Sequence, residues 1–292
     1  MQFESLKVFC DLADTESFTK AAQVNGVTQS AVSQTISALE RQFKSLLIER
    51  SKKNFRLTSE GEVLYEYSKR LLQGYESIHS KLQELKNEIS GTVRVSAVYS
   101  IGLHDLPPYI KAFLKEHPTV NLHVEYRREN NVYEDVLGNI VDLGLVSYPN
   151  HDSKLEVVPL RKDPLVLICP PQHALAKAKT ARFKALEGQK YVGFDSDMPT
   201  RKAIDRIFKE QGVSVEYAME FDNIETIKRA VEIGSGIAVV PESTIRQEVA
   251  DQSLAAVRLE GNHMRLMGAI YKKSKVLSPA MKQFLELLKK PI

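Results

Sequence analysis

A run of short hydroxyl and amide side chains without any charge lies between Thr28 and Ala38 of this 292-residue chain. Glutamine can pair with adenine through two hydrogen bonds, and serine and threonine bond to donors or acceptors. A solvent-exposed helix usually carries Glu and Lys, so this face favours contact with base edges and phosphates over simple solvation. The candidate DNA contacts are Thr28, Gln29, Ser30, Ser33, Gln34 and Ser37.

Basic residues follow this run directly. Between Arg41 and Arg56 six basic residues face one acid, Glu49, which gives the segment a net charge of +5, whereas the whole chain carries only +3. Residues 46–58 read as strand, basic turn and strand, which predicts a wing whose tip lies along phosphates or in the minor groove. The predicted backbone contacts are Arg50, Lys52, Lys53 and Arg56.

Two short helices must position these side chains. The first directs Ala21 and Ala22 inward and ends at Gly26, where glycine allows the positive φ of a tight turn. Thr28 is the expected N-cap of the second helix. Residues about 4–14 predict a further helix that packs behind both. The second helix is expected to bury one apolar stripe, made of Ala31, Val32, Ile36, Leu39 and Phe43.

Five motifs occur in the order and spacing of one family. They are Phe18-Thr-Lys-Ala-Ala22, Val27-Thr-Gln-Ser-Ala-Val-Ser33, Leu39-Glu40, Ile48-Glu-Arg50 and Arg56-Leu-Thr-Ser-Glu-Gly61. Through them the first 90 residues resemble the N-terminus of a LysR-type transcriptional regulator. The chain departs from the family's usual residues at Asn25, Lys44 and Ile48, where Leu, Gly and Phe are common.

A long helix is predicted after the wing. Thr58-Ser59-Glu60-Gly61-Glu62 is a hydroxyl cap followed by acids, which is typical of a helix start. The helical pattern continues to about Ile89, a length of about 48 Å at about 1.5 Å per residue. Its apolar positions have the spacing of a coiled-coil seam: Leu64, Tyr67, Leu71, Tyr75, Ile78, Leu82, Leu85 and Ile89.

We therefore expect this helix to pair with its copy in a second subunit. Pairing would place the two copies of the helix that follows Thr28, which we call the reader helix, about one DNA turn or a multiple of it apart. The alternative is packing against the chain's own second domain. The resemblance allows a homodimer or a homotetramer.

From residue 91 onward predicted strands and helices alternate, which implies parallel sheets. Two sheets joined by crossings near residues 162 and 267 would form two lobes with a cleft. The LysR-type resemblance extends here through Leu143-Gly-Leu145 and Val231-Glu-Ile-Gly-Ser-Gly-Ile-Ala-Val-Val-Pro241. It implies an effector domain similar to type 2 periplasmic binding proteins.

The expected fold class is therefore a mainly α winged helix-turn-helix with a long linker helix, followed by a two-lobed α/β effector domain. The expected domains are a DNA-binding domain (1–58), a dimerisation helix (59–90) and an effector-binding domain (91–292). Within the last, lobe I comprises 91–161 and 268–292, and lobe II comprises 162–267.

In open α/β sheets, ligands bind outside the carboxyl ends of the strands, where helices begin. Ser100 and Thr200 are the preferred hydroxyls, one from each lobe, with Arg201 as a possible anion partner. Serine and threonine at helix starts are often caps only, which is the alternative. The expected ligand is a small polar or anionic metabolite. The candidate set is Tyr99, Ser100, Ile101, Ser147, Ser196, Thr200 and Arg201.

Several classes of site lack the residues they need. Cys10 and Cys169 lie far apart in apolar contexts, so we expect core residues, and the seven histidines form no H-x-x-x-H pair. Gly234-Ser235-Gly236 lacks the spacing of nucleophile or phosphate loops. We expect no metal, no cofactor and no enzyme. No run approaches the ~18 apolar residues of a membrane span, so we expect no membrane partner and a cytoplasmic location.

The sequence thus predicts a ligand-responsive transcriptional regulator that binds double-stranded DNA. One rival is a two-lobed enzyme or solute-binding protein with an added helical domain, which would need a catalytic constellation or an export signal. The other is an architectural DNA protein, which would not need some 200 residues of cleft-forming structure.

Overall fold

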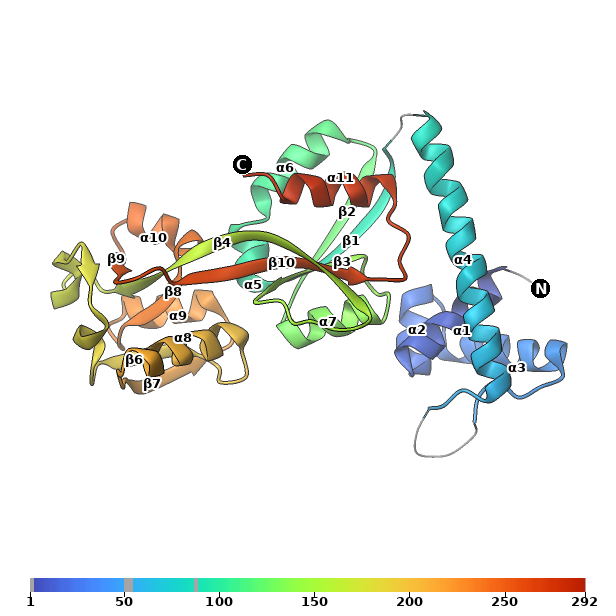
Figure 1. Cartoon of the computed structure of the whole chain (residues 1–292), viewed down its shortest axis with the longest axis horizontal. Helices are drawn as coiled ribbons and strands as arrows, with labels where there is room; N and C mark the ends of the chain where they lie inside the picture. The colour runs from blue at the N-terminus through green and yellow to red at the C-terminus, as the bar shows by residue number, and fades with distance from the viewer. Residues whose placement is uncertain (1–2, 50–54, 87–88, 292) are drawn as a thin grey trace.

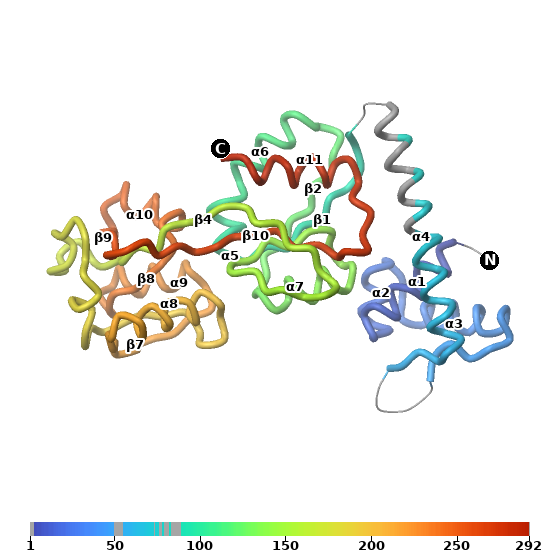
Figure 2. Tube along the Cα trace, viewed as in Figure 1, coloured from blue at the N-terminus to red at the C-terminus, as the bar shows by residue number. Residues whose placement is uncertain are grey.

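The computed structural model describes residues 3–49, 55–86 and 89–291. The chain extends along one axis in three parts (Figures 1 and 2). A helical reader domain with a long helix, α4, lies at one end, lobe I lies in the middle and lobe II at the other end. Each part has its own hydrophobic core.

The reader domain is built by α1 (Phe3–Thr15), α2 (Phe18–Asn25) and α3 (Gln29–Phe43). Gly26 ends α2 with φ 63°, and the Thr28 side chain accepts a hydrogen bond from the Ala31 amide at 3.2 Å. The predicted turn and N-cap are confirmed. The buried core residues are Leu6, Val8, Phe9, Leu12, Ala21, Ala22, Val32, Ile36, Leu39, Leu47 and Ile48.

The expected burial of Phe43 is wrong, since its side chain is 42% exposed. Phe43 is the last residue of α3, and Lys44 then turns the chain with a left-handed φ of 53°. Leu47 and Ile48 reach the core instead, because the turn directs them back under the helix.

The predicted wing is described only at its base. Ile48 and Leu57 form an antiparallel bridge, and the Glu49 amide donates to the Arg56 carbonyl at 2.9 Å. Arg56 is exposed. The predicted contacts Arg50, Lys52 and Lys53 lie outside the described residues.

Helix α4 (Ser59–Lys86) begins against the reader domain. The Thr58 hydroxyl accepts a hydrogen bond from the Gly61 amide at 3.0 Å, as expected of a cap. A Cβ at Gly61 would overlap the Leu47 carbonyl, so glycine lets α4 approach the strand base closely. Leu64 packs on the core of the reader domain, and Ile89 packs on the core of lobe I. The expectation that both belong to the coiled-coil seam is therefore wrong.

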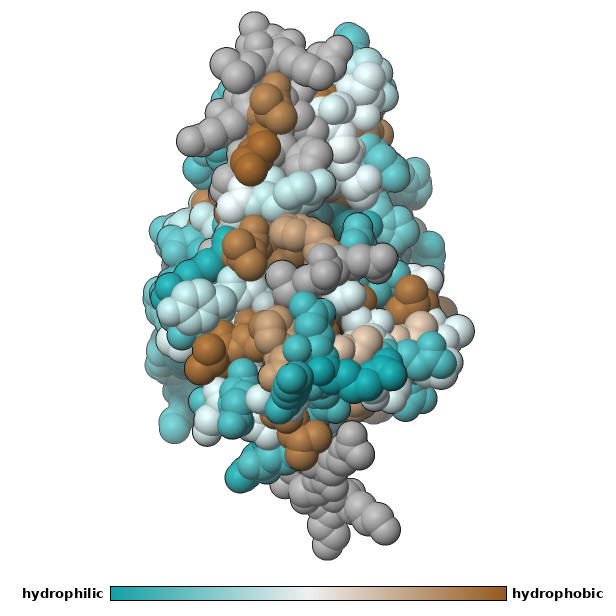
Figure 3. All heavy atoms as spheres, turned by 90° about the vertical axis from the view of Figure 1, so that its right-hand side faces the viewer, coloured by the Kyte–Doolittle hydropathy of each residue, from teal (hydrophilic) through white to brown (hydrophobic). Residues whose placement is uncertain are grey.

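Helix α4 also carries a row of exposed apolar residues. Figure 3 shows brown side chains on the side of the molecule where α4 lies. Each of these residues is between 48% and 58% exposed: Val63, Tyr67, Leu71, Tyr75, Ile78 and Leu82.

Lobe I contains a mixed sheet rather than a parallel one. Strands β1 (Gly91–Val98), β2 (Val120–Arg127) and β3 (Leu143–Ser147) are parallel, whereas β10 (Met264–Lys272) runs antiparallel to β3. The chain re-enters lobe I from lobe II, so its returning strand must run in the opposite direction. The helices of lobe I are α5 (Tyr99–His104), α6 (Pro107–Glu116), α7 (Glu129–Leu137) and α11 (Pro279–Leu288).

One long strand, β4 (Leu155–Cys169), connects the lobes. It pairs with β10 up to Pro164 and with β8 (Ala238–Pro241) from Leu165 onward. The two expected sheets are therefore joined through β4. The remaining elements of lobe II are η1 (Ala174–Lys177), β5 (Thr180–Ala181), η2 (Phe183–Leu186), β6 (Lys190–Phe194), α8 (Pro199–Glu210), β7 (Glu216–Phe221), α9 (Ile224–Glu232), η3 (Glu242–Ile245), α10 (Arg246–Ala250) and β9 (Ala255–Leu259).

Candidate DNA-binding face and effector cleft

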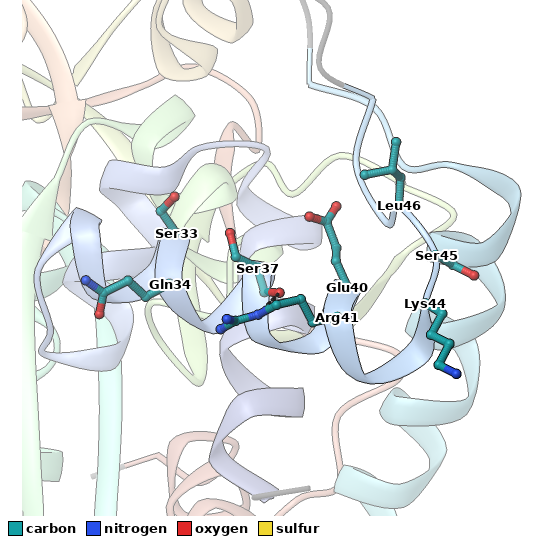
Figure 4. Close-up of a pocket in the computed structure, with 8 residues that line it drawn as sticks. All are labelled: Ser33, Gln34, Ser37, Glu40, Arg41, Lys44, Ser45 and Leu46. Carbon is teal, nitrogen blue, oxygen red and sulfur yellow. Dashed lines mark hydrogen bonds between the residues drawn. The ribbon is translucent and has the colours of Figure 1, made fainter.

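The polar face of α3 is exposed along the helix. Gln29, Ser30, Ser33, Gln34 and Ser37 are all exposed, as is the cap residue Thr28. A groove of about 640 Å³ follows this face toward the end of the helix (Figure 4). Its lining residues are Ser33, Gln34, Ser37, Glu40, Arg41, Lys44, Ser45 and Leu46.

Charge in this groove is predominantly basic. Glu40 is its acid, and one of its carboxylate oxygens accepts a hydrogen bond from the Leu47 amide at 3.0 Å. Arg41 lies back along α3, where its Nε donates to the Ser37 carbonyl at 3.3 Å (Figure 4). Arg41 and Lys44 were counted in the basic segment but not among the predicted contacts. Their position in the groove adds both to the candidate face.

Two residues of the effector set lie in lobe I next to the strands that connect the lobes. Ser100 is the second residue of α5, a helix of six residues. Its Oγ accepts a hydrogen bond from Arg265 Nη1 at 2.7 Å. Ser147 is buried at the end of β3, opposite Met267 of β10. Both therefore lie beside the strand that returns from lobe II.

Tyr99 and Ile101 flank Ser100 in different environments. The Tyr99 ring lies 6.3 Å from the Tyr126 ring, between ring centroids, and remains partly exposed. Ile101 is buried in the lobe I core, so its side chain serves packing rather than a ligand.

Arg265 is a buried charge that sequence reasoning missed. It is 0% exposed, and its Nη2 lies 2.9 Å from an Asp105 oxygen and 2.8 Å from an Asp163 oxygen. Ser243 joins the group, because its Oγ donates to Asp163 at 2.7 Å. No local pattern links these residues, which are separated by 22 to 160 positions from Arg265.

The effector candidates in lobe II differ in exposure and in their partners. Thr200 is buried near the start of α8, and Ser196 is exposed. The expectation of an anion partner fails for Arg201, because Asp205 at 2.8 Å and Glu220 already neutralise its guanidinium. That guanidinium also lies over the Tyr217 ring, 3.7 Å from the centroid.

Other residues bridge the lobes directly. Arg128 of lobe I pairs with Asp195 at 2.5 Å and Asp222 at 3.3 Å in lobe II. His104 lies 2.7 Å from Glu225 on the other lobe. Among the described residues, no hydrogen bond or ion pair links Ser196, Thr200 or Arg201 to the lobe I candidates. Charged pairs therefore connect the two lobes, and the predicted hydroxyls of the two lobes do not contact one another among the described residues.

The turn after β2 supplies Arg128, one of these bridging residues. Glu129 begins α7 directly after Arg128, and its buried Oε1 has no hydrogen-bond partner among the described residues. Burial raises the pKa of Glu129 to about 8, against a smaller lowering by Lys202. The rule that ligands lie beyond strand ends applies to β2 as well, so it would have found this turn.

Asp14 connects the reader domain to the rest of the chain. Its buried carboxylate accepts hydrogen bonds from Tyr65 at 2.5 Å and Lys69 at 2.5 Å on α4. Across the domain boundary it accepts from Asn139 at 2.6 Å and lies 2.9 Å from Lys272. The pKa of Asp14 would rise with burial, but the two lysines hold it below its usual value.

Other kinds of site find little support in the described part of the chain. Its residues contain no group of three or more His, Cys, Asp or Glu side chains able to hold a metal ion. Cys10 and Cys169 are free and buried, as expected. Among the described helices, none is both long and apolar enough to cross a membrane.

Comparison with known proteins agrees with this arrangement. Residues 3–62 match the bacterial regulatory helix-turn-helix protein, lysR family, and residues 86–291 match the LysR substrate binding domain. The HTH-type transcriptional regulator CysL of Bacillus subtilis is 27% identical over 89% of this chain and 87% of its own. The RuBisCO operon transcriptional regulator of Allochromatium vinosum is 28% identical over 99% of this chain and 95% of its own.

Solved structures share the fold. Full-length OxyR from Pseudomonas aeruginosa has a TM-score of 0.75 at 21% identity, covering 99% of this chain and 93% of its own. Full-length CbnR complexed with its target DNA has a TM-score of 0.60 at 21% identity, covering 99% of each chain. The CcmR regulatory domain of Synechocystis PCC6803 in complex with 2-PG has a TM-score of 0.63 at 24% identity, covering 68% of this chain and 96% of its own.

These relatives are transcriptional regulators rather than enzymes. With a reader helix exposed at one end, a two-lobed domain at the other and both family matches in place, the chain belongs to the LysR family of DNA-binding, effector-responsive transcriptional regulators.

Proposed function

We propose that α3 enters the major groove and reads bases through its uncharged face. The contacts would come from Gln29, Ser30, Ser33, Gln34 and Ser37, with Thr28 at the phosphate near the helix start. Arg50, Lys52, Lys53 and Arg56 would hold the backbone, together with Arg41 and Lys44. The observation that carries this proposal is the exposed, charge-free face of α3. The acid in the adjoining groove, Glu40, accepts a hydrogen bond from the Leu47 amide of the chain itself.

The test is binding to the duplex DNA that flanks the protein's own gene. Gln34→Ala should weaken operator binding by about 1–3 kcal/mol, because a base contact is lost. Gln42→Ala is a matched control, since Gln42 is exposed on α3 but does not line the groove. Equal affinity of Gln34→Ala and wild type in a footprinting titration would contradict this role of α3.

We further propose that α4 pairs with α4 of a second subunit. Six apolar side chains are exposed on one face, a contiguous surface that a monomer would leave in water. The chain's own lobes do not cover this face, which argues against the alternative of packing on the second domain. The assembly would be a homodimer or a homotetramer.

Sedimentation equilibrium tests this pairing at micromolar concentration. Leu71→Lys should shift the protein toward monomer, because it places a charge in the middle of the apolar stripe. Glu66→Gln is the control, because Glu66 is exposed on α4 outside the stripe. A wild-type protein that remains monomeric would refute the pairing.

The effector would be a small polar or anionic metabolite bound between the lobes of a cytoplasmic protein. Ser100 and Thr200 are its preferred contacts, with Tyr99, Ser147 and Ser196 around them. The CcmR domain that shares this fold is in complex with 2-PG, so 2-PG is a reasonable first compound to test. Any effector must bind two states of the regulator with different affinity in order to change DNA binding.

Substitution in the cleft separates effector response from DNA binding. Ser100→Ala and Thr200→Ala should abolish the response to an identified effector, while operator binding in its absence remains. A retained response in both variants, measured by effector-dependent footprinting, would exclude these two hydroxyls as contacts.

A further inference from the structure

Helix α4 and lobe I meet at the carboxylate of Asp14 in the reader domain, whose side chain is 5% exposed. Oδ1 accepts a hydrogen bond from the Tyr65 hydroxyl of α4 at 2.5 Å and lies 2.9 Å from Lys272 Nζ of lobe I. Oδ2 accepts from Lys69 Nζ of α4 at 2.5 Å and from the Asn139 side-chain amide of lobe I at 2.6 Å. Each oxygen therefore holds one donor from α4 and one from lobe I.

These contacts use the full capacity of the carboxylate. Its two oxygens offer about four lone-pair sites, and a donor group lies at each of them. The two donors of lobe I are themselves fixed. Lys272 is buried and also donates to the Leu137 carbonyl at 3.0 Å, and Asn139 follows α7 with a left-handed φ of 55°. The contact therefore specifies one setting of the reader domain on lobe I.

Around Asp14 the contact between the reader domain and lobe I is weaker. Thr15 approaches Gly138, since a Cβ at Gly138 would lie 3.5 Å from Thr15 Cγ2. Lys20 pairs with Glu134 at 3.3 Å, but these side chains are 49% and 59% exposed, and such a pair contributes little. A groove of about 1010 Å³, lined by both domains, lies beside these residues. Asp14 is therefore the buried centre of a small contact.

The lobe I side of this contact continues to the junction between the lobes. Lys272 is the last residue of β10, and Arg265 lies near the other end of that strand. Close to Arg265, β4 passes from β10 to β8 of lobe II, at Leu165. We call this crossing, with its buried ion pair between Arg265 and Asp163, the hinge. Strand β10 thus runs from the hinge to the contact with the reader domain (Figure 1), and Arg265 and Lys272 are about 23 Å apart at about 3.3 Å per residue.

We propose that Asp14 is a positioning residue that docks the reader domain on lobe I of the same chain, so that the two turn as one body about the hinge. A change in the angle between the lobes then moves α3 directly, without passing along α4. The alternative is that α4 alone carries the reader domain. Burial would raise the pKa of Asp14, but the two lysines hold it below its ordinary value, so the carboxylate is charged at neutral pH.

A distance measurement between two spin labels on the full chain tests the docking. The labels are attached through Gln42→Cys on α3 and Lys111→Cys on α6 of lobe I, because both positions are exposed, whereas Cys10 and Cys169 are buried. Dilution with unlabelled protein restricts the signal to distances within one chain. Without further substitution, the labelled protein should give one narrow distance distribution.

Two substitutions release lobe I from Asp14 and leave its bonds to α4. Asn139→Gly deletes the side-chain amide and keeps the left-handed backbone, which glycine adopts freely. Lys272→Met deletes the ammonium group and keeps a side chain of similar length. Each should broaden the distance distribution. Because the two act on different oxygens of Asp14, either variant decides the question if the other fails to fold.

Gln252→Gly is the matched control. Gln252 also has a left-handed φ, of 58°, but it is exposed and follows α10 in lobe II. Its substitution should leave the distribution narrow. A narrow distribution in the Asn139→Gly and Lys272→Met variants, a broad one without either substitution, or equal broadening in Gln252→Gly would overturn the docking.

The spacing of operator half-sites provides a second measurement, which rests on the proposed pairing of α4. Lengthening this spacing by about five base pairs turns one half-site to the opposite face of the duplex. Wild type should then bind at least about tenfold more weakly, because its readers are fixed, and Asn139→Gly should lose less. Equal losses would overturn the positioning role. If wild type binds no duplex at all, the proposed function fails, and the label distances, measured without DNA, still decide the docking.

Discussion

The reader face and the effector cleft use polar side chains in opposite ways. On α3, Gln34 and its neighbours are exposed, and water can satisfy them until DNA arrives. Between the lobes, on the paired strands β10 and β4, Arg265 and Asp163 are buried and bond to each other. Burial without a partner costs free energy, so the cleft must complete most of its bonds within the chain.

This difference teaches which substitutions report on function. A change on the exposed face of α3 removes a side chain that we propose contacts only DNA, so it should alter DNA binding and leave folding intact. A change at the hinge removes a partner that the folded chain needs, so stability changes first. Predictions about the two regions can therefore be ranked by how much buried structure each one disturbs.

The largest effect is expected at Arg265. Arg265→Met would leave Asp105 and Asp163 buried beside a neutral side chain, and breaking a buried pair in this way costs about 3–5 kcal/mol. Urea unfolding of the full chain measures this loss in the effector-domain transition. Arg161→Met should cost less than about 1 kcal/mol, because the Arg161 side chain is 36% exposed. Equal losses of stability in both variants would contradict the expectation that the buried arginine matters more than the partly exposed one.

The next effect concerns the start of α4. Gly61→Ala would force a Cβ against the Leu47 carbonyl, and such overpacking costs about 1–3 kcal/mol. Gly74→Ala on the same helix meets no atom within 4 Å, so its higher helix propensity should stabilise by up to about 1 kcal/mol. Thermal unfolding distinguishes the two. A stabilising Gly61→Ala would show that α4 does not rest closely on Leu47.

Glu129 should make stability depend on pH. Folding raises its pKa from 4.5 to about 8, so the native state holds a proton that the unfolded chain has lost across this range. Stability therefore falls as pH rises through that window. Glu129→Gln removes this loss, so its melting temperature should exceed that of wild type at pH 9 and approach it near pH 4. An unchanged difference between these pH values would contradict the raised pKa.

Asp14 provides the opposite case. Its folded pKa lies below the ordinary value of 3.8, so its contribution to stability is present above that value and is lost as pH falls through the folded pKa. Asp14→Asn should therefore destabilise at pH 7 and converge with wild type in acid. Melting curves of both variants over one pH series test the pair together.

The smallest effect is expected from a single cation at the wing base. Arg56→Ala should reduce the slope of log K against log salt by about 0.9, because one phosphate contact is lost. The control is Arg258→Ala, an exposed arginine in β9 of lobe II. Affinity titrations at several salt concentrations measure both slopes, and equal slopes would place Arg56 away from phosphate.

Local sequence was sufficient where neighbours along the chain decide the structure. The turn at Gly26, the cap at Thr28 and the polar face of α3 all follow from residues within a few positions of one another. Phe43 was misassigned because periodicity does not reveal where a helix leaves the core. The short helix α5 was missed because its six residues carry no helical period.

Long-range contacts limited the prediction of the cleft. Arg201 looked available in sequence, yet Glu220, which lies 19 residues away, already pairs with it. Arg265 carried no signal, because its partners come from α5, β4 and η3. The antiparallel return of β10 likewise depends on where the chain comes back from lobe II.

The sequence by itself determined the reader helix, its caps, the long helix after it and the alternation that builds the lobes, because hydrogen bonds and packing between near neighbours specify these. Only the tertiary structure decided which polar groups remain free. In a buried environment a charge must find a partner, and that partner is chosen by which distant segments the fold brings within about 3 Å.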